Sequence, residues 1–390
     1  MTHKIKLATV CQQIRGVSYT PKDMAEIPTE GYIPILRANN IQEKLVFNEL
    51  VYVNANKISK IQLLKGGDIV VCASSGSKNL VGKAARFVSS PVDQVSFGAF
   101  CKVVRPRNID ASYLSHFFNS SYYRNTISKI AQGANINNIR NEHLDNLDIN
   151  VPTPSEQKRI AERLDKVQEL IAKQKEQIAK LDLLIKSRFL DMFGDPISNP
   201  KKWPTRRMGD IFKITSGGTP STQEDSYWLN GTISWIGSNL CQNIILNKND
   251  GRFITEKGLN NSSAKILPVG TVLIALVGAT IGKTALLNFS TTTNQNVAAI
   301  WVSKEESYDS LFVFYFIQGL YDLFMRLGSG KFKMANLQFI NNLPIFNVPL
   351  VLQSQFANFV KSVEQQKEVF STRLSHFETL YKSLMQEYFG

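Results

Sequence analysis

Two segments of the chain hold residue types that could bind phosphate or cleave a phosphodiester. Residues 278–284 read Gly-Ala-Thr-Ile-Gly-Lys-Thr, which is close to a phosphate-binding loop. Such a loop needs four residues between its glycines so that backbone N–H groups can surround a phosphate, and here only three separate Gly278 from Gly282. Glu156 and Lys158 match the end of a nuclease motif, but an acid at a helix start is favoured by the helix dipole. We therefore expect neither an NTPase nor a nuclease site.

The residues that could bind a metal or act as catalytic nucleophiles lack the spacing that such sites require. The four cysteines, Cys11, Cys72, Cys101 and Cys241, form no Cys-x-x-Cys pair, and the four histidines are not spaced as ligands on one helix face. The sequence contains no Gly-x-Ser-x-Gly elbow, no His-Glu-x-x-His and no Asp/Asn-Pro-Pro-aromatic tetrapeptide of amino-group methyltransferases. The sequence predicts a chain with no catalytic residue, no metal site and no cofactor of its own.

Composition points to a polyanionic partner. The 390 residues carry 45 Lys+Arg against 32 Asp+Glu, a net charge of +13, which favours nucleic acid before a membrane surface. A basic but otherwise ordinary soluble protein is the alternative. The N-terminus lacks the apolar core of a signal peptide, and the longest apolar stretch, 269–279, falls short of the ~20 residues of a membrane span. We expect a cytoplasmic protein with no membrane partner.

Polar and basic loops are the candidates for nucleic-acid contact. Glycines and small hydroxyl residues let backbone N–H groups approach phosphate, lysine adds charge, and amides can pair with an adenine edge. An ordinary solvated loop is the alternative for each residue, but the clusters occur at matching places in the two halves. In the first half the candidates are Arg37, Asn39, Asn40, Ser75, Ser77, Lys78, Asn79 and Lys83. In the second half they are Ser216, Gly217, Gly218, Thr219, Ser238, Asn239, Thr280, Lys283, Asn294, Asn296, Lys331 and Lys333.

The chain repeats itself. The residues Leu184, Lys186, Ser187, Phe193 and Gly194 recur 196 positions later. Towards the front of each half the offset is about 200, where Gly82-Lys83 matches Gly282-Lys283 and Gly16 matches Gly217. One architectural unit is therefore present twice in tandem.

Each unit is predicted to be a β-rich globular part followed by a long helix, an α+β architecture. Apolar runs bounded by glycine predict strands at 68–72 and 271–275. Aromatic-rich helical stretches at 112–131 and 307–327 are typical of core packing. Ser155 is the expected N-cap of the first long helix and Gly194 its stop.

Both long helices carry a heptad seam, interrupted by Gln174 in the first and Lys367 in the second. The first seam is Ile160, Leu164, Val167, Ile171, Ile178, Leu181 and Ile185. The second is Phe356, Val360, Val363, Phe370, Leu374, Phe377 and Tyr381. An apolar stripe needs a partner, and the other helix of the same chain, running antiparallel over about 57 Å, is the simplest one. Two separate helices used in dimer contacts are the alternative.

The order and double occurrence of these motifs carry a resemblance. The Leu-x-Lys-Ser…Phe-Gly helix ends, the helix entry at 147–161 and the loops at 216–220 and 278–283 resemble the specificity (S) subunit of Type I restriction–modification systems. The resemblance implies target recognition domains at 1–152 and 197–349, with helical regions at 153–196 and 350–390 that pair as an antiparallel coiled coil.

The same resemblance implies the partners. The two domains would read the halves of a bipartite, asymmetric site in double-stranded DNA. Modification (M) subunits would bind S-adenosylmethionine and methylate adenine N6, and restriction (R) subunits would use ATP and Mg to translocate and cut. Self-association of the chain through its exposed coil, when M subunits are absent, is a question that the sequence leaves open.

Two features leave questions open. Arg15-Gly16-Val17-Ser18 replaces the Gly-Gly-Thr-Pro loop of the second half, so we expect the two domains to read different sequences. A coiled-coil scaffold with two protein-binding domains is the alternative function, and steep salt dependence of binding would distinguish a DNA reader from it.

Overall fold

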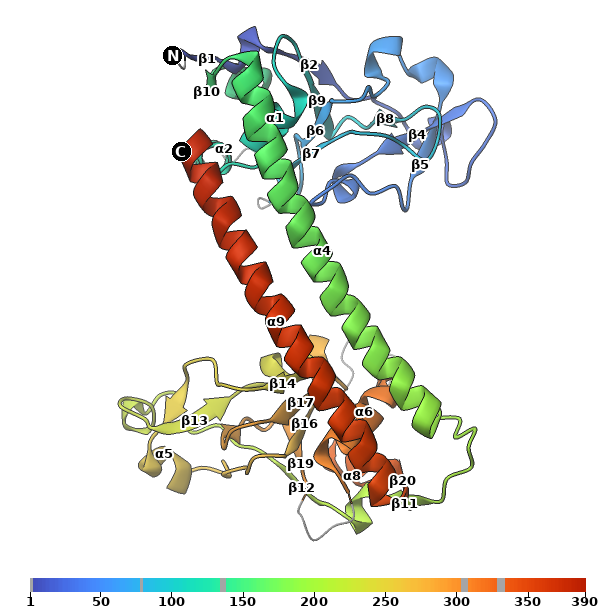
Figure 1. The fold of residues 1–390 in the computed structure, drawn as a ribbon, viewed down its shortest axis with the longest axis vertical. Helices are drawn as coiled ribbons and strands as arrows, with labels where there is room; N and C mark the ends of the chain where they lie inside the picture. Colours follow the sequence, from blue (N-terminus) through green and yellow to red (C-terminus); the bar gives the residue numbers. More distant parts are fainter. Residues whose placement is uncertain (1–2, 78–79, 134–137, 303–307, 328–333) are drawn as a thin grey trace. The chain divides into compact units, whose positions relative to one another are not determined.

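The computed structural model describes residues 3–77, 80–133, 138–302, 308–327 and 334–390 (Figure 1). The fold is α+β, as predicted, and divides into two compact units. Unit 1 contains Met1–Glu176 with Ser371–Gly390, and unit 2 contains Gln177–Phe370. This division differs from the four predicted regions because each globular part packs on segments of both long helices.

In its described residues, unit 1 contains three small sheets and three α-helices besides its segments of the long helices. Their strand orders are β1-β10, β2-β9-β6-β7 and β3-β5-β4-β8. All neighbours are antiparallel except β4 and β8, which run parallel. The strands are β1 (His3–Lys6), β2 (Cys11–Arg15), β3 (Met24–Ala25), β4 (Tyr32–Leu36), β5 (Val51–Asn54), β6 (Ile69–Cys72), β7 (Ala84–Arg86), β8 (Ser96–Phe97), β9 (Cys101–Pro106) and β10 (Asp148–Val151). The helices are α1 (Ala111–Phe117), α2 (Ser121–Gly133) and α3 (Asn141–Asp145).

Unit 2 repeats this plan. Its strand orders are β11-β20, β12-β19-β16-β17-β14 and β15-β13-β18. The pair β13 and β18 is parallel like β4 and β8, and the additional strand β14 also runs parallel to β17. The strands are β11 (Thr205–Arg207), β12 (Lys213–Ser216), β13 (Ile233–Ile236), β14 (Ile244–Leu246), β15 (Phe253–Ile254), β16 (Val272–Ala275), β17 (Thr284–Leu287), β18 (Thr292–Thr293), β19 (Val297–Trp301) and β20 (Pro344–Phe346). The helices are α5 (Glu256–Asn260), α6 (Ser310–Gly319), α7 (Tyr321–Met325) and α8 (Leu337–Asn342).

Backbone hydrogen bonds confirm the predicted repeat. The N–H of Gly82 donates to the carbonyl of Cys72 at 2.8 Å, and the N–H of Gly282 donates to that of Ala275 at 2.9 Å. Both glycines have left-handed backbones, with φ of 79° and 75°. Gly82-Lys83 and Gly282-Lys283 therefore match in structure as well as in sequence.

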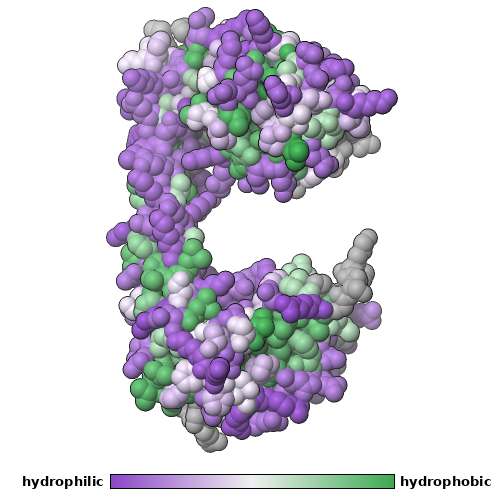
Figure 2. Space-filling model, turned by 90° about the vertical axis from the view of Figure 1, so that its right-hand side faces the viewer, coloured by the Kyte–Doolittle hydropathy of each residue, from purple (hydrophilic) through white to green (hydrophobic). Residues whose placement is uncertain are grey.

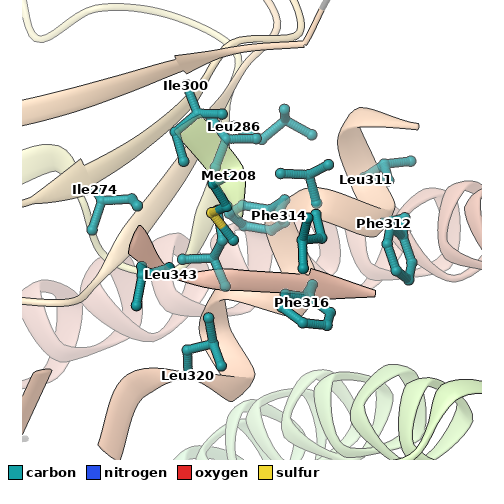
Figure 3. Close-up of a cluster of buried hydrophobic side chains, with 14 of the residues drawn as sticks. Met208, Ile274, Leu286, Ile300, Leu311, Phe312, Phe314, Phe316, Leu320 and Leu343 are labelled. Carbon is teal, nitrogen blue, oxygen red and sulfur yellow. The ribbon is translucent and has the colours of Figure 1, made fainter. Parts of the chain in front are cut away.

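The predicted strands and helices form with shifted or broken ends. Both predicted strands, β6 and β16, begin one residue later than expected and are fully buried, as continuous apolar runs predict. Each aromatic-rich stretch is divided into two helices, α1 with α2 and α6 with α7. Their interpretation as core is confirmed, because Phe314 and Phe316 of α6 lie in one buried cluster with Met208 (Figure 3).

The long helices are α4 (Pro154–Phe193) and α9 (Leu350–Phe389). The predicted N-cap Ser155 is wrong: α4 already begins at Pro154, a residue that fits the first helical turn. The hydroxyl of Thr153 instead accepts the N–H of Glu156 at 3.4 Å. Gly194, with φ of 81°, follows the last helical residue as expected.

Within each unit the two long helices pack antiparallel. In unit 1, Nη1 of Arg163 and Nε2 of Gln168 donate to the hydroxyls of Tyr388 and Tyr381, each at 2.9 Å. In unit 2, Nζ of Lys367 lies 2.7 Å from Oδ1 of Asp182. Residues with increasing numbers on α4 therefore contact residues with decreasing numbers on α9, as antiparallel helices do. Every residue of both predicted seams is buried or half-buried, as the predicted pairing of the two helices requires.

A buried glutamine fixes each globular part to a long helix. Gln157 accepts the N–H of Asp110 and donates to the carbonyl of Pro152, both at 2.8 Å. Gln353 makes the equivalent bonds to Asp309 and Val348, at 2.9 and 2.8 Å. The two glutamines stand 196 positions apart, which is the offset of the repeat, so both units attach to their long helix in the same way.

The surface is mainly polar. On the face drawn in Figure 2, hydrophilic residues dominate and hydrophobic residues gather only in small patches. No helix in the described part of the chain combines the length and hydrophobicity needed to cross a membrane.

Candidate nucleic-acid interface

Four loops of unit 1 meet where β2, β4, β6 and β8 end. The N–H of Val17, after β2, donates to the carbonyl of Phe97 at 2.8 Å, and the N–H of Gly98, after β8, donates to that of Leu36 at 2.9 Å. The N–H of Ala73, after β6, donates to the carbonyl of Phe100 at 2.9 Å. These backbone bonds join the loops into one edge, which we call the loop edge of unit 1.

Unit 2 has the same edge, formed by the loops after β12, β13, β16 and β18. The N–H of Gly218 donates to the carbonyl of Thr293 at 2.7 Å, and the N–H of Asn294 to that of Ile236 at 3.2 Å. The N–H of Leu276 donates to the carbonyl of Asn296 at 2.8 Å. Each bond has its counterpart in unit 1, so two scaffolds of the same design carry different side chains.

The first loop of each edge requires glycine. A Cβ on Gly16 would lie 2.1 Å from the carbonyl oxygen of Gly98, and one on Gly217 would lie 2.0 Å from that of Thr293. Neither backbone could approach so closely with a side chain present. The predicted match of Gly16 with Gly217 therefore marks a shared close contact between the first and fourth loops.

A groove of about 680 Å³ lies along the loop edge of unit 1. The predicted contacts Arg37, Asn39 and Ser75 all line it. Sequence reasoning missed two aromatic residues there, Tyr19 and Phe100, of which Phe100 is 70% exposed. Burial raises the pKa of the Tyr19 hydroxyl, although the nearby Arg37 guanidinium opposes that shift.

The other first-half candidates have different surroundings. Asn40 is fully buried: its Oδ1 accepts the N–H of Arg37 and its Nδ2 donates to the carbonyl of Asn48, both at 2.9 Å. It shapes the loop and is not presented to a base. Ser77 is exposed, and Lys83 is half-buried just before β7. Lys78 and Asn79 lie outside the described residues, as do Lys331 and Lys333 of the second half.

The second-half candidates gather on the loop edge of unit 2. The hydroxyl of Thr219 donates to Oε1 of Gln295 at 2.7 Å, which joins the first and fourth loops. Nζ of Lys283 donates to Oε1 of Gln242 at 2.9 Å. Asn239 is exposed, whereas Gly217 and Gly218 are buried. The half-buried candidates are Ser216, Ser238, Thr280, Asn294 and Asn296.

Sequence reasoning also missed Arg252. Its guanidinium stacks over the ring of Trp235 at 4.7 Å, and Nη2 lies 2.6 Å from Oδ2 of Asp250 and 3.3 Å from Oδ1 of Asn239. The hydrogen bond from Arg252 holds the pKa of the Asp250 carboxyl below its usual range. The Asp-Gly-Arg triplet at 250–252 was the available signal, because a turn glycine there sets an acid beside an arginine.

Comparison with known proteins places the repeat in a family. The model of the Type I restriction modification DNA specificity domain matches residues 3–182 and again residues 200–375. The chain belongs to this family. Each match starts at or just before the first strand of a unit and ends inside a long helix, so one specificity domain corresponds to one repeat.

Two curated specificity subunits illustrate the relationship. The chain is 35% identical over 263 residues to the Type I restriction enzyme StySPI specificity subunit of Salmonella potsdam, covering 67% of this chain and 51% of the relative. It is 37% identical over 201 residues to the EcoKI specificity subunit of Escherichia coli strain K12, covering 50% and 43%. The chain thus spans about half the length of these curated relatives.

Solved structures share the fold. The S subunit of the Type I restriction–modification system from M. genitalium has a TM-score of 0.60 at 15% identity, covering 100% of this chain and 96% of that one. A chain from a structure of type I R-M complex assembly and conformational transition has a TM-score of 0.55 at 17% identity, covering 100% and 97%. The specificity-domain fold is therefore present along the whole chain.

Proposed function

We propose that this chain is the DNA-recognition subunit of a Type I restriction–modification complex. Its target recognition domains, at 1–152 and 197–349, each read one half of a bipartite, asymmetric site in double-stranded DNA. The observation that carries the proposal is the duplicated loop edge, in which one hydrogen-bonded scaffold presents two different sets of side chains. Two scaffolds of one design with unlike side chains suit two unlike half-sites.

The chemistry of each edge supports contact with DNA. Lysine, hydroxyl and backbone N–H groups suit phosphates and fix the register, whereas arginine and amide side chains suit base edges in the major groove. The equivalent positions Phe100 and Asn296 differ in this respect, since one is apolar and the other an amide. The net charge of +13 favours a polyanion over the alternative of a protein-binding scaffold.

The reactions belong to partner subunits in this proposal. Modification subunits supply S-adenosylmethionine and methylate adenine N6 where this chain directs them. Restriction subunits supply ATP- and Mg-dependent translocation and cleavage. The chain itself contributes no catalytic residue and no cofactor, acts in the cytoplasm, and self-associates when modification subunits are absent.

Methylome sequencing tests the proposal most directly. Cells expressing this chain together with its modification subunit are compared with cells expressing the modification subunit alone. We expect N6-methyladenine in a split motif, two short specified blocks around a fixed gap, only when both chains are present. A stable complex of the two chains that leaves no modified motif would overturn the proposal.

A further inference from the structure

Each loop edge holds one arginine beside the same turn, although the two arginines come from different backbone positions. The parallel strand pairs show which positions of the two units are equivalent. Leu36 of β4 is paired with Phe97 of β8, and Ile236 of β13 is paired with Thr293 of β18. Position 37 therefore corresponds to position 237. Arg37 in the first domain is thus replaced by Gly237 in the second.

The neighbouring strand shows the opposite exchange. Ile35 is registered with Val51 in unit 1, and in unit 2 the N–H of Trp235 donates to the carbonyl of Arg252 at 3.1 Å. Position 51 therefore corresponds to position 252. The first domain has arginine and valine at the two positions, and the second has glycine and arginine.

The space at this turn explains the exchange. A Cβ on Gly237 would lie 3.2 Å from Nη2 of Arg252 and 2.7 Å from Oδ1 of Asn239. Glycine at 237 therefore leaves the room that the Arg252 guanidinium occupies. In unit 1 the equivalent strand position holds the buried Val51, whose side chain does not fill that space. Arg37, which stands on the turn itself, lines the groove there instead.

Both arginines are hydrogen-bonded to a residue at an equivalent position in the two units. Nη2 of Arg37 donates to the backbone carbonyl of Glu49 at 2.9 Å, and Arg252 bonds the carboxylate of Asp250. Glu49 and Asp250 each stand two residues before the compared strand position. Nη1 of each arginine has no hydrogen-bond partner among the residues that the structure describes. Each guanidinium is thus held by its neighbours and keeps Nη1 unpaired within the described part of the chain, whereas Nη2 of Arg252 is already bonded to both Asp250 and Asn239.

We infer that Arg37 and Arg252 are the guanine-reading residues of the first and second domains. Each would donate from the unpaired Nη1 of its guanidinium to the O6 and N7 edge of a guanine in its half-site, and this rests on the proposed function. A guanidinium already held by its neighbours loses less freedom on binding. The Asp250 carboxylate, 2.6 Å from Arg252, would repel a phosphate but not a neutral base, which favours base contact over backbone contact.

Selection from a random-sequence duplex library, with the full chain and its modification subunit, tests the inference. Arg252→Lys keeps the charge but loses the fork. We expect it to reduce one guanine preference in one block by roughly tenfold or more and to leave the other block unchanged. Arg37→Lys should do the same in the other block. Arg206→Lys, on exposed β11 of unit 2, is the matched control and should change neither.

Replacing the preferred guanine with 7-deazaguanine removes its N7 acceptor. This should weaken binding of the wild type but not of the variant that lacks the corresponding arginine. A wild-type split motif that both lysine variants leave intact would overturn the inference while the proposed function stands. Uniform weakening across all sequences would do so too, because it marks a phosphate contact. A wild type that enriches no sequence would overturn the proposed function and the inference together.

Discussion

Asn40 and Gly16 shape the loop edge of unit 1 from beneath its surface. Asn40 bonds two backbone groups of its own loop, and Gly16 lets the first loop approach the fourth. Each is buried and directly follows an exposed residue, Asn39 before Asn40 and Arg15 before Gly16. Substitutions there should therefore affect stability first and DNA contact only through the loop's shape.

Replacing Asn40 with alanine should lower the free energy of unfolding of unit 1 by about 1–3 kcal/mol, because the N–H of Arg37 and the carbonyl of Asn48 lose their partner. Denaturant unfolding measures this. Asn39→Ala, at the exposed neighbour, should change stability by no more than about 0.5 kcal/mol. Equal losses in the two variants would contradict the assigned role of Asn40.

Gly16→Ala should cost about 1–3 kcal/mol, because its Cβ would collide with the carbonyl of Gly98, which already accepts the N–H of Cys101. Gly76→Ala, in another loop of the same edge, meets nothing within 4 Å and should be nearly neutral. Thermal unfolding of both variants checks the difference. If Gly16→Ala unfolds like the wild type, the close approach of the loops is not required.

Some contact candidates were predictable from sequence and others were not. Arg37, Asn39 and Ser75 follow strands in polar loops, and the structure brings them to one groove. The burial of Asn40 depends on how a short turn folds back, which residue type does not reveal. Arg252 reaches the edge of unit 2 only because β15 pairs with β13, a contact that local sequence does not encode.

The long helices are the most predictable elements. Their heptad spacing alone fixes which side chains face the partner helix, and both seams lie as predicted. The start of α4 was misplaced because Thr153 and Ser155 are both good caps, and Pro154 between them favours the earlier start.

Leu164→Ala should lower the free energy of unfolding by about 2–5 kcal/mol, because the side chain is fully buried in the core of unit 1. Leu183, on the same helix, is 63% exposed, so Leu183→Ala should change stability by no more than about 0.5 kcal/mol. Denaturant unfolding of both variants is the measurement. A large loss for Leu183→Ala would mean that its face is covered in the isolated chain.

A polar network joins α1, α4 and α9 within unit 1. Asp165 accepts from the hydroxyl of Ser112 at 2.6 Å and lies 2.9 Å from Nε2 of His116, whose Nδ1 lies 3.1 Å from the hydroxyl of Tyr381. Burial alone raises the pKa of Asp165, but the hydrogen bonds from His116 and Ser112 outweigh it, and the pKa is lowered from 3.8.

Because the folded state lowers this pKa, the ionised Asp165 stabilises unit 1 above its unfolded pKa, and that contribution is lost as pH falls through the acid range. Urea midpoints measured from about pH 6 down to about pH 3 should decline less steeply for Asp165→Asn than for the wild type. Parallel declines would show that other carboxyls carry the acid sensitivity.

At the scale of the whole molecule, the net charge of +13 should govern the proposed association with DNA. If Lys83 and Lys283 each contact a phosphate, replacing both with glutamine should reduce the slope of log affinity against log salt by about 0.9 per lost contact. The preferred motif should stay unchanged. Binding titrations at several salt concentrations measure the slope, and an unchanged slope would remove both lysines from the phosphate contacts.

The sequence predicts the tandem repeat, but it does not predict which segments of the chain make up each compact unit. A heptad pattern indicates that a helix has a partner. It does not identify which segment of the partner helix packs into the core of which unit. In unit 1 that segment is the end of α9, whose Leu384, Met385 and Phe389 are buried with α1 and α4. Only the packed structure reveals this assignment.

The order in which the ribosome makes these pieces follows from the same feature. Unit 2 is one continuous stretch, Gln177–Phe370, and is complete as soon as it has emerged. Unit 1 begins first but waits for Ser371–Gly390, an interval of roughly 10 to 40 s at about 5–20 residues per second. During translation the first domain to be synthesised is therefore the last to close its core, and its apolar surface stays open to chaperones until synthesis has passed through the second.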